Sequence, residues 1–410
     1  MSGPAAQRPL AGVRICLVFE HSLSHYSRLL TEIRGLQEAG AEVSLLTAHP
    51  GGPGEPPWMS RTMTPLDLAS AIPPSTASMR PVRVASNLTR GLMRRLAERL
   101  PLSVRAFARI RALKRLARTT DIFWVIDFPS LPSTLKVALE TGCKVVYETV
   151  DLVPEYLYRG PRYRDRQLRA ERALIDKVDG FITACDSYAD YYVERYGDVL
   201  ERRPTVRDNM PEAIAADITP RHTPLKLLFL GSLMFDRPIV PIIESMVYTT
   251  ADVVLTLQGK NLVGDPLNTR IRELGVAERV RIVQPCAPDR IVEAAHEHDV
   301  GIVALSGADE NERRAATSKL FTYMAAGLAV LGSNLPGIGR AIDAAGSGCL
   351  VTGMQARDWA RAIDEVASLP ETEIEDLKRR SLVWASEYAW PVQKPRFIAE
   401  FVRALDALDP

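Results

Sequence analysis

The chain alternates short apolar runs with stretches of helical periodicity, and this alternation constrains its fold more than any other feature. Val13–Phe19 is apolar, Leu29, Ile33 and Leu36 then recur on one helical face, and Glu42–Thr47 is again apolar. Apolar runs without strict two-residue alternation are typical of strands buried on both faces of a parallel sheet. The first 47 residues therefore predict a strand, a helix and a second parallel strand.

The same rhythm continues along most of the 410 residues, a length that suffices for two or three domains. Further strands are predicted at 122–126, 144–148, 180–184, 226–230, 253–258, 280–283, 300–305 and 328–332, and helices at 131–140, 163–176, 188–195 and within 359–408. The proline-rich stretch 204–224 is the predicted linker. We predict an α/β fold with two Rossmann-like, doubly wound domains, 1–210 and 225–385, that face each other across a cleft.

Two segments of the first domain depart from this rhythm. Residues 50–81 are rich in Pro, Gly and Ser and are expected to form a loop excursion. Residues 80–118 carry twelve Arg or Lys and one acid, Glu98, on two helix-period stretches. These helices either pack on the sheet with solvated arginine faces or form a basic surface for weak peripheral contact with anionic lipid.

Composition and absent motifs narrow the classes of function. With 51 Lys and Arg against 50 Asp and Glu, nothing favours a nucleic-acid partner. Five scattered cysteines without metal-ligand spacing predict no metal site and a reducing, cytoplasmic location. The sequence lacks GxGxxG after its first strand, GxxxxGK[ST] and GxSxG, the motifs typical of dinucleotide oxidoreductases, P-loop enzymes and serine hydrolases. It also lacks Asp-x-Asp, a common anchor for a metal-bound diphosphate. No cofactor is therefore expected.

Two turns of the second domain have the composition of an anion site. Gly231 lets the backbone approach a ligand, beside Ser232, and Arg237 offers a bidentate cation. Thr317 or Ser318 can cap a helix whose N-terminus, with Lys319, favours a phosphate. Each turn alone is also compatible with an ordinary strand–helix connection, but together they predict a diphosphate site.

Polar residues of the first domain also follow predicted strands, where α/β sheets bind ligands. Asp127 is a candidate catalytic base or acceptor-orienting group, or else a cap for the next turn, and His25 is a second catalytic candidate. The candidate acceptor-side residues are His21, Arg28, Glu148 and Asp151.

In this order, the segments resemble the GT-B glycosyltransferases, especially the family 4 enzymes that use nucleotide sugars. The resemblance covers roughly 12–405, apart from 50–81, and its most specific stretch is SKLFTYMAAGLAVLGSNLPGIGRAI at 318–342. The other matching stretches are RLLTEIRGLQEAGAEVSLLT (28–47), VIDFPSLPS (125–133), KVVYETVDLVPE (144–155), ERALIDKVDGFITACDSYADYYVERYG (171–197), LKLLFLGSL (225–233) and VRIVQPCAPDRIVEAAHEHDVGIVAL (280–305). YAWPV near 388 is similar to the point where a C-terminal helix, here 390–410, crosses back onto the first domain.

The resemblance implies a metal-independent, anomer-retaining transfer of a sugar from a nucleoside diphosphate, held mainly by the second domain, to an acceptor held mainly by the first. It also implies that Thr322 lies near the ribose and that Gln258, Val283 and Pro285 lie near the base. The chain departs from the family at several site positions. Ser232 replaces an arginine, Arg237 replaces a lysine, Arg314 and Thr322 replace paired glutamates, Ile126 and Val150 replace histidines, and residues 20–25 replace a glycine-rich loop.

These departures leave three hypotheses. The first is a glycosyltransferase that acts on a natural-product, cell-envelope or other small-molecule acceptor. The second is a non-catalytic nucleotide-binding relative that supports another enzyme. The third is an enzyme of the same fold that uses an unusual donor, by pseudo-glycosyl transfer or by epimerising a nucleotide sugar.

Overall fold

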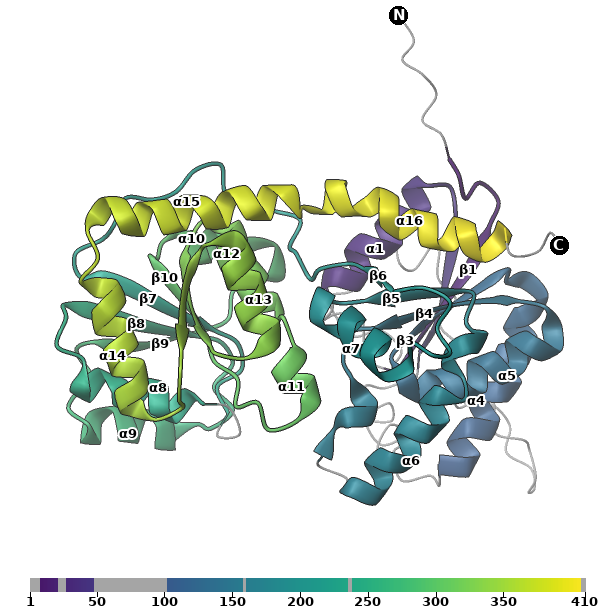
Figure 1. Cartoon of the computed structure of the whole chain (residues 1–410), viewed down its shortest axis with the longest axis horizontal. Helices are drawn as coiled ribbons and strands as arrows, with labels where there is room; N and C mark the ends of the chain where they lie inside the picture. Colours follow the sequence, from purple (N-terminus) through teal and green to yellow (C-terminus); the bar gives the residue numbers. More distant parts are fainter. Residues whose placement is uncertain (1–7, 21–26, 48–101, 158–159, 235–237, 407–410) are drawn as a thin grey trace, which may run out of the picture.

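The computed structural model of the chain contains two parallel sheets of six strands, each covered by helices on both faces (Figure 1). The structure describes residues 8–20, 27–47, 102–157, 160–234 and 238–406. This architecture confirms the predicted α/β fold with two doubly wound halves. The predicted 50–81 excursion and the first part of the basic region, up to residue 101, lie outside the described residues.

The first sheet has the strand order β2-β1-β3-β4-β5-β6 and the second has the order β12-β11-β10-β7-β8-β9. All neighbours in both sheets pair in parallel. The strands are β1 (Arg14–Phe19), β2 (Glu42–Thr47), β3 (Ile122–Ile126), β4 (Lys144–Thr149), β5 (Gly180–Thr183), β6 (Thr205–Val206), β7 (Leu225–Leu230), β8 (Val253–Gln258), β9 (Val280–Val283), β10 (Val300–Val303), β11 (Ala329–Ser333) and β12 (Gly348–Val351).

Helices up to α13 connect successive strands, three further helices follow the last strand, and together they cover the two faces of each sheet. In the first half they are α1 (Ser27–Glu38), α4 (Leu102–Leu116), α5 (Leu131–Thr141), α6 (Pro161–Arg172) and α7 (Asp186–Tyr196). In the second half they are α8 (Ile239–Tyr248), α9 (Asp265–Glu273), α10 (Ile291–His296), α11 (Glu310–Arg314), α12 (Ser318–Ala325), α13 (Pro336–Ala345), α14 (Ala356–Ala367) and α15 (Glu371–Glu387). The last helix of the chain, α16 (Trp390–Asp406), packs on the first half. No helix within these described ranges is long and apolar enough to cross a membrane.

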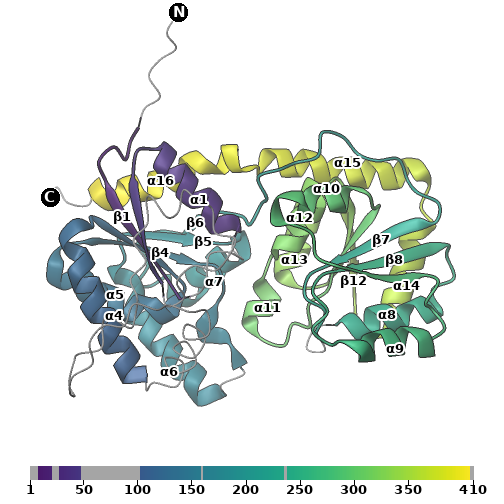
Figure 2. The same ribbon diagram turned by 180° about the vertical axis from the view of Figure 1, so that it is seen from behind.

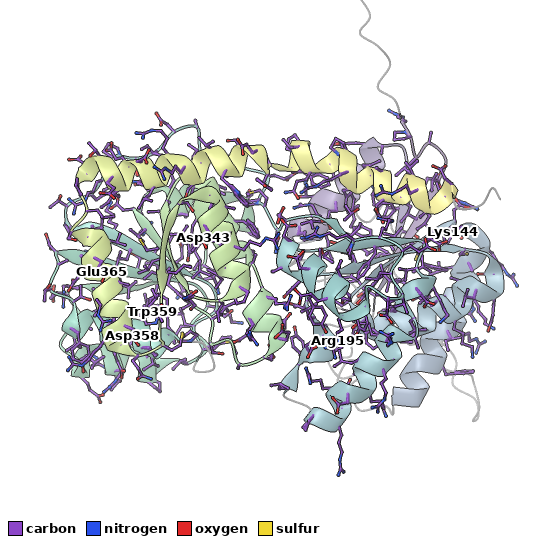
Figure 3. All side chains as sticks on the ribbon, in the orientation of Figure 1. Lys144, Arg195, Asp343, Asp358, Trp359 and Glu365 are labelled. Atoms are coloured by element: carbon purple, nitrogen blue, oxygen red, sulfur yellow. The ribbon has the colours of Figure 1, made fainter. Side chains whose placement is uncertain are left out.

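The central strands are apolar because both of their faces are buried. Every residue of β3 is buried, and Trp124 in its middle packs edge-on against Phe397 and Phe401 of α16. In the second half, Trp359 of α14 is fully buried in the core on one face of the sheet (Figure 3). Such burial on two faces removes the alternating pattern that a half-exposed strand would show.

The helix α15 lies over the second half, and the last helix, α16, continues directly from its end and lies over the first sheet (Figures 1 and 2). Its buried Glu400 accepts a hydrogen bond from the backbone N–H of Phe181 in β5 at 2.7 Å. Glu400 also accepts from Thr205 in β6 at 2.8 Å. The predicted crossing of a C-terminal helix back onto the first domain is therefore confirmed.

Two short edge strands were missed, and one of them corrects the predicted linker. Thr205–Val206 forms β6 on β5, so the stretch 204–224 begins inside the first sheet. Gly348–Val351 forms β12 on β11. Both strands are short and lie at a sheet edge, where only one neighbour stabilises them and the apolar signal is weak.

The described part of the predicted basic region is the helix α4. Its Ala112 and Leu113 are buried in the same core as α5, and Lys114 pairs with Glu140 of α5 at 2.6 Å. Phe107, on the same helix, is 60% exposed, and Arg111, Arg115 and Arg118 are also exposed. The helix thus packs on the domain through one side, and contact of its basic side with lipid stays a prediction.

Candidate functional site

Lys319 lies against the turn that follows β7, so the two predicted anion-binding turns meet. A Cβ atom on Gly231 would lie 2.8 Å from Cε and 3.5 Å from Nζ of Lys319. Gly231 has a φ of 126°, a conformation that side chains rarely adopt. The ammonium group also lies 5.3 Å from the ring centre of Phe229 in β7. The ammonium group of Lys319 and the backbone of Gly231 therefore lie side by side at the carboxyl end of the second sheet.

The N-terminus of α12 carries this lysine in its first turn. Thr317 is the N-cap residue, but its side chain makes no capping hydrogen bond, which corrects the expected side-chain cap. Its buried Oγ1 has no hydrogen-bond partner in the part of the chain that the structure describes. Ser318 is exposed. The first-turn N–H groups of a helix have no partner within the helix, so this end favours an anion.

Tyr323 ties α12 to the middle of the second sheet. Its hydroxyl accepts a hydrogen bond from the N–H of Leu230 at 2.7 Å and donates one to the carbonyl of Ile302 at 3.2 Å. Its ring covers Gly301, where a Cβ atom would lie 2.2 Å from the ring. Tyr323 thereby fixes the distance between the end of β7 and the helix that bears Lys319. Tyr323 is not among the residues predicted from the sequence, although a tyrosine beside the apolar residues of α12 was a visible signal.

The other residues predicted for the donor side lie at the same edge of the second sheet. Gln258 ends β8, and its carbonyl accepts a hydrogen bond from the N–H of Gly231 at 3.0 Å. Val283 ends β9 and is exposed, as is Pro285, while Ser232 is half-buried after Gly231. Three further candidates, His21, His25 and Arg237, lie outside the described residues.

Asp127 follows β3 and has a backbone conformation that is unusual for a residue with a side chain. Its φ is 59° and its ψ is 158°, a region occupied almost only by glycine. Its Oδ1 accepts hydrogen bonds from the N–H groups of Val150 and Asp151, at 2.9 and 3.1 Å. Burial, followed by the nearby charge of Asp151, raises the pKa of Asp127 well above its usual range. The carboxyl group thus caps the turn after β4, and its raised pKa keeps it a candidate for proton transfer.

Arg28 and Glu148 do not present their side chains to an acceptor, which corrects the acceptor-side prediction. Their side chains are 4% and 0% exposed and form an ion pair with 2.5 Å between Nη2 and Oε1. Arg28 also pairs with Glu32 at 2.9 Å, and Trp124 donates to Oε2 of Glu148 at 2.9 Å. Arg207, fully buried, lies 3.2 Å from the same Glu32. These five side chains form a buried network that joins α1, β3, β4 and the residue that follows β6.

The positions where family glutamates are replaced also have defined contacts. Arg314 pairs with Glu310 at 2.5 Å and with Glu194 of α7 at 2.6 Å. Thr322 donates its hydroxyl to the carbonyl of Ser318 at 2.8 Å, so its proton is used within the helix. In the predicted contact with the ribose, the hydroxyl oxygen of Thr322 can therefore accept a hydrogen bond but has no proton left to donate.

The carboxyl end of the first sheet contacts the segment after β10 of the second. The Ser187 hydroxyl, in the first turn of α7, donates to the carbonyl of Arg314. Arg340 of α13 pairs with Asp190 of α7, and both views place α11 beside α7 (Figures 1 and 2). The two halves thus meet at the ends where parallel α/β sheets bind ligands, as the predicted facing arrangement requires.

Among the described residues, no group of three or more His, Cys, Asp or Glu side chains is arranged to hold a metal ion. What the site offers is a lysine, a helix N-terminus and a glycine turn in one domain, and a strained aspartate with a raised pKa in the other. Two Rossmann-like domains that place these groups at the carboxyl ends of their sheets have the architecture of the GT-B class.

Comparison with known families agrees with that class. Residues 27–207 match the family described as glycosyl transferase 4-like domain, and residues 225–368 match glycosyl transferases group 1. Together the two matches cover most of both halves. The chain belongs to the GT-B glycosyltransferases.

Curated relatives are more distant and match only part of the chain. A D-inositol 3-phosphate glycosyltransferase of Rhodococcus opacus (strain B4) is 26% identical over 233 residues, which are 51% of this chain and 50% of the relative. The enzyme of the same name from Rhodococcus jostii (strain RHA1) is 33% identical over 106 residues, 26% of this chain and 22% of the relative. The alignment thus spans half of one relative and less of the other.

Solved structures match over nearly the whole chain. A sucrose-phosphate synthase from Thermosynechococcus elongatus has a TM-score of 0.69 and 16% identity, with 97% of this chain and 100% of that chain covered. HepE of Anabaena, solved with UDP and glucose, has a TM-score of 0.67 and 13% identity, with 96% and 100% covered. At these identities the likeness establishes the shared fold.

Proposed function

We propose that this protein transfers a sugar from a nucleoside diphosphate, bound by the second domain, to an acceptor bound by the first. The observation that carries the proposal is the contact of Lys319 with Gly231 beside the N-terminus of α12. A diphosphate leaving group gains negative charge as the sugar bond breaks. A fixed ammonium group and helix N–H groups stabilise that charge without reorganising.

The proposed transfer needs no resident metal, since Lys319 and the helix N-terminus supply the positive potential that a metal–diphosphate site would otherwise provide. In the first domain, Asp127 is the group proposed to orient the acceptor hydroxyl or to take its proton. We propose retention of the anomeric configuration, in which the leaving phosphate can also accept this proton. Structures of HepE with UDP and with UDP-glucose make UDP-glucose the first donor to test.

Calorimetric titration with UDP, GDP, ADP and dTDP tests the donor site. One of these nucleotides should bind with a Kd below about 1 mM. Lys319→Ala should weaken its binding by about 1.5–3 kcal/mol, the usual value for a charge-assisted hydrogen bond. Lys136→Ala, which removes an exposed lysine of α5, is the matched control and should leave affinity unchanged. If no nucleotide binds to the folded protein, or if both variants bind it equally, the diphosphate site is misplaced.

A non-catalytic relative is the second candidate, because Arg314 forms ion pairs at one glutamate position and Thr322 bonds to its own helix at the other. Incubation of the wild type with its donor and a panel of acceptors, beginning with inositol phosphates, separates the two candidates. Glycosylated product supports transfer. Tight nucleotide binding without turnover of any donor supports the non-catalytic role, and conversion of the donor alone supports epimerisation.

A further inference from the structure

Asn311 of α11 reaches from the second domain into the first. Its Oδ1 accepts a hydrogen bond from the backbone N–H of Leu152 at 2.7 Å and another from the hydroxyl of Tyr188 at 2.6 Å. Asn311 is only 8% exposed, and both of its partners are buried. One amide oxygen therefore satisfies two buried donors that belong to the other domain.

The orientation of Asn311 is fixed within its own domain. The side chain of Asp309 accepts a hydrogen bond from the N–H of Glu312 at 2.9 Å and so caps the N-terminus of α11. Three residues after Asn311, Arg314 contacts α7 of the first domain through Glu194 and Ser187. Residues three apart lie on the same side of a helix, so one side of α11 makes both contacts.

The loop that Asn311 contacts is the one that Asp127 caps. Asp127 accepts hydrogen bonds from the N–H groups of Val150 and Asp151, and Asn311 accepts from the next one, that of Leu152. The Thr149 hydroxyl donates to the carbonyl of Asp151 at 2.8 Å and closes the turn. Three successive N–H groups are thus held by two side chains, one from each domain.

We propose that Asn311 is a positioning residue that orders the 150–152 loop, and through it Asp127, only when the two domains are in contact. Separation of the domains would withdraw the partner of Leu152 and Tyr188 at once, while Asp127 would retain its own two contacts. The loop then loses one of its three anchors, and the strained backbone of Asp127 loses part of the structure that holds it. The inference rests on the transfer reaction proposed above, because it assigns to domain contact the placement of the acceptor-side carboxyl group.

Hydrogen exchange of the Leu152 amide tests the contact without any substrate. Asn311→Ala should raise this exchange rate by at least about tenfold, as expected for the loss of a buried hydrogen bond. Asn311→Asp keeps an oxygen at the same place and should recover most of the protection. Arg340→Ala removes an exposed ion pair at the same domain contact and is the matched control, with Leu152 exchange expected to stay within about twofold of wild type.

Kinetics test the positioning role. Asn311→Ala should lower kcat by at least about tenfold while the nucleotide Kd stays within about twofold, because the proposed donor site lies mainly in the second domain. Unchanged Leu152 exchange overturns the contact, and raised exchange with unchanged kcat overturns its positioning role. If the wild type turns over no donor, the proposed transfer fails, yet the exchange measurement still decides whether Asn311 orders the loop.

Discussion

The side chain of Lys319 occupies the space that a Cβ atom on Gly231 would need, with 2.8 Å between that position and Cε. This relationship joins two turns that are 88 residues apart in the sequence and makes the proposed diphosphate site sensitive to a single methyl group. A change at Gly231 should therefore act on Lys319 even though it removes no charge.

Gly231→Ala should weaken nucleotide binding by about tenfold or more, because the new methyl group displaces the lysine from the turn. It should also cost about 1–3 kcal/mol of stability, since φ at this position is 126°. Gly264→Ala is the matched control: its φ is 77°, but a Cβ atom there would meet nothing within 4 Å. Calorimetry should show strain-related destabilisation in both variants and weaker binding only in the first; equal binding would contradict the site.

Asp127→Asn separates the capping role of Asp127 from its proton chemistry. The amide oxygen can still accept hydrogen bonds from Val150 and Asp151, so the turn should persist. An amide cannot take a proton, and kcat should fall by about 10²–10⁴ with nucleotide affinity unchanged.

The pH profile gives an independent check of Asp127. Burial raises the pKa of this carboxyl group to about 8. A base with this pKa is active once deprotonated, so wild-type kcat should rise with pH through about 8, and the variant should lack that rise. A variant that keeps kcat within about twofold of wild type would leave Asp127 with the capping role alone.

Four strands were located with the right bounds: Glu42–Thr47, Ile122–Ile126, Val253–Gln258 and Val280–Val283. Of these, Ile122–Ile126 is the continuous apolar run that complete burial allows. The rule that ligands bind at the carboxyl ends of parallel strands then pointed to Gly231 and Lys319. The contact between these two residues is seen only in the folded structure. It was nevertheless expected, because loops at the carboxyl ends of parallel strands lie at the same edge of the sheet.

What the sequence could not provide is the identity of partners that are distant along the chain. Glu148 follows a strand like a ligand-binding residue, yet Arg28, 120 positions earlier, and Trp124 neutralise and bury it. Asn311 lies in a polar segment without any motif, and its role depends on the packing of one domain against the other. Burial of a polar side chain is decided by tertiary neighbours, and local pattern carries little information about it.

Glu148→Ala should act on stability more than on acceptor recognition. Its removal leaves Arg28 and the indole N–H of Trp124 with fewer partners in the buried network, at a cost of about 3–5 kcal/mol. Glu212→Ala is the control, because it breaks the exposed Arg34–Glu212 pair, which is worth about 0–1 kcal/mol. Urea denaturation monitored for the first domain measures both; a Glu148 variant with wild-type stability and a raised acceptor KM would restore the acceptor-side role.

Glu171 of α6 should make stability depend on pH. It is buried and accepts hydrogen bonds from Tyr192 and Tyr196, both at 2.9 Å, while burial raises its pKa to about 7 from its ordinary value of 4.5. The folded protein therefore binds a proton that the unfolded chain releases between these two values. The stabilisation from the protonated group is complete below pH 4.5 and is lost as the pH rises through about 7.

Glu171→Gln replaces this group by a neutral side chain that keeps an acceptor for the two tyrosine hydroxyls. The free energy of unfolding of the wild type should fall relative to that of the variant by on the order of 1–3 kcal/mol as the pH rises from 4.5 to above 7. Urea titrations of both proteins across this interval measure the difference. Two curves that stay parallel across the interval would mean that Glu171 is ionised in the folded protein, with the tyrosine hydroxyls stabilising its charge strongly enough to outweigh burial.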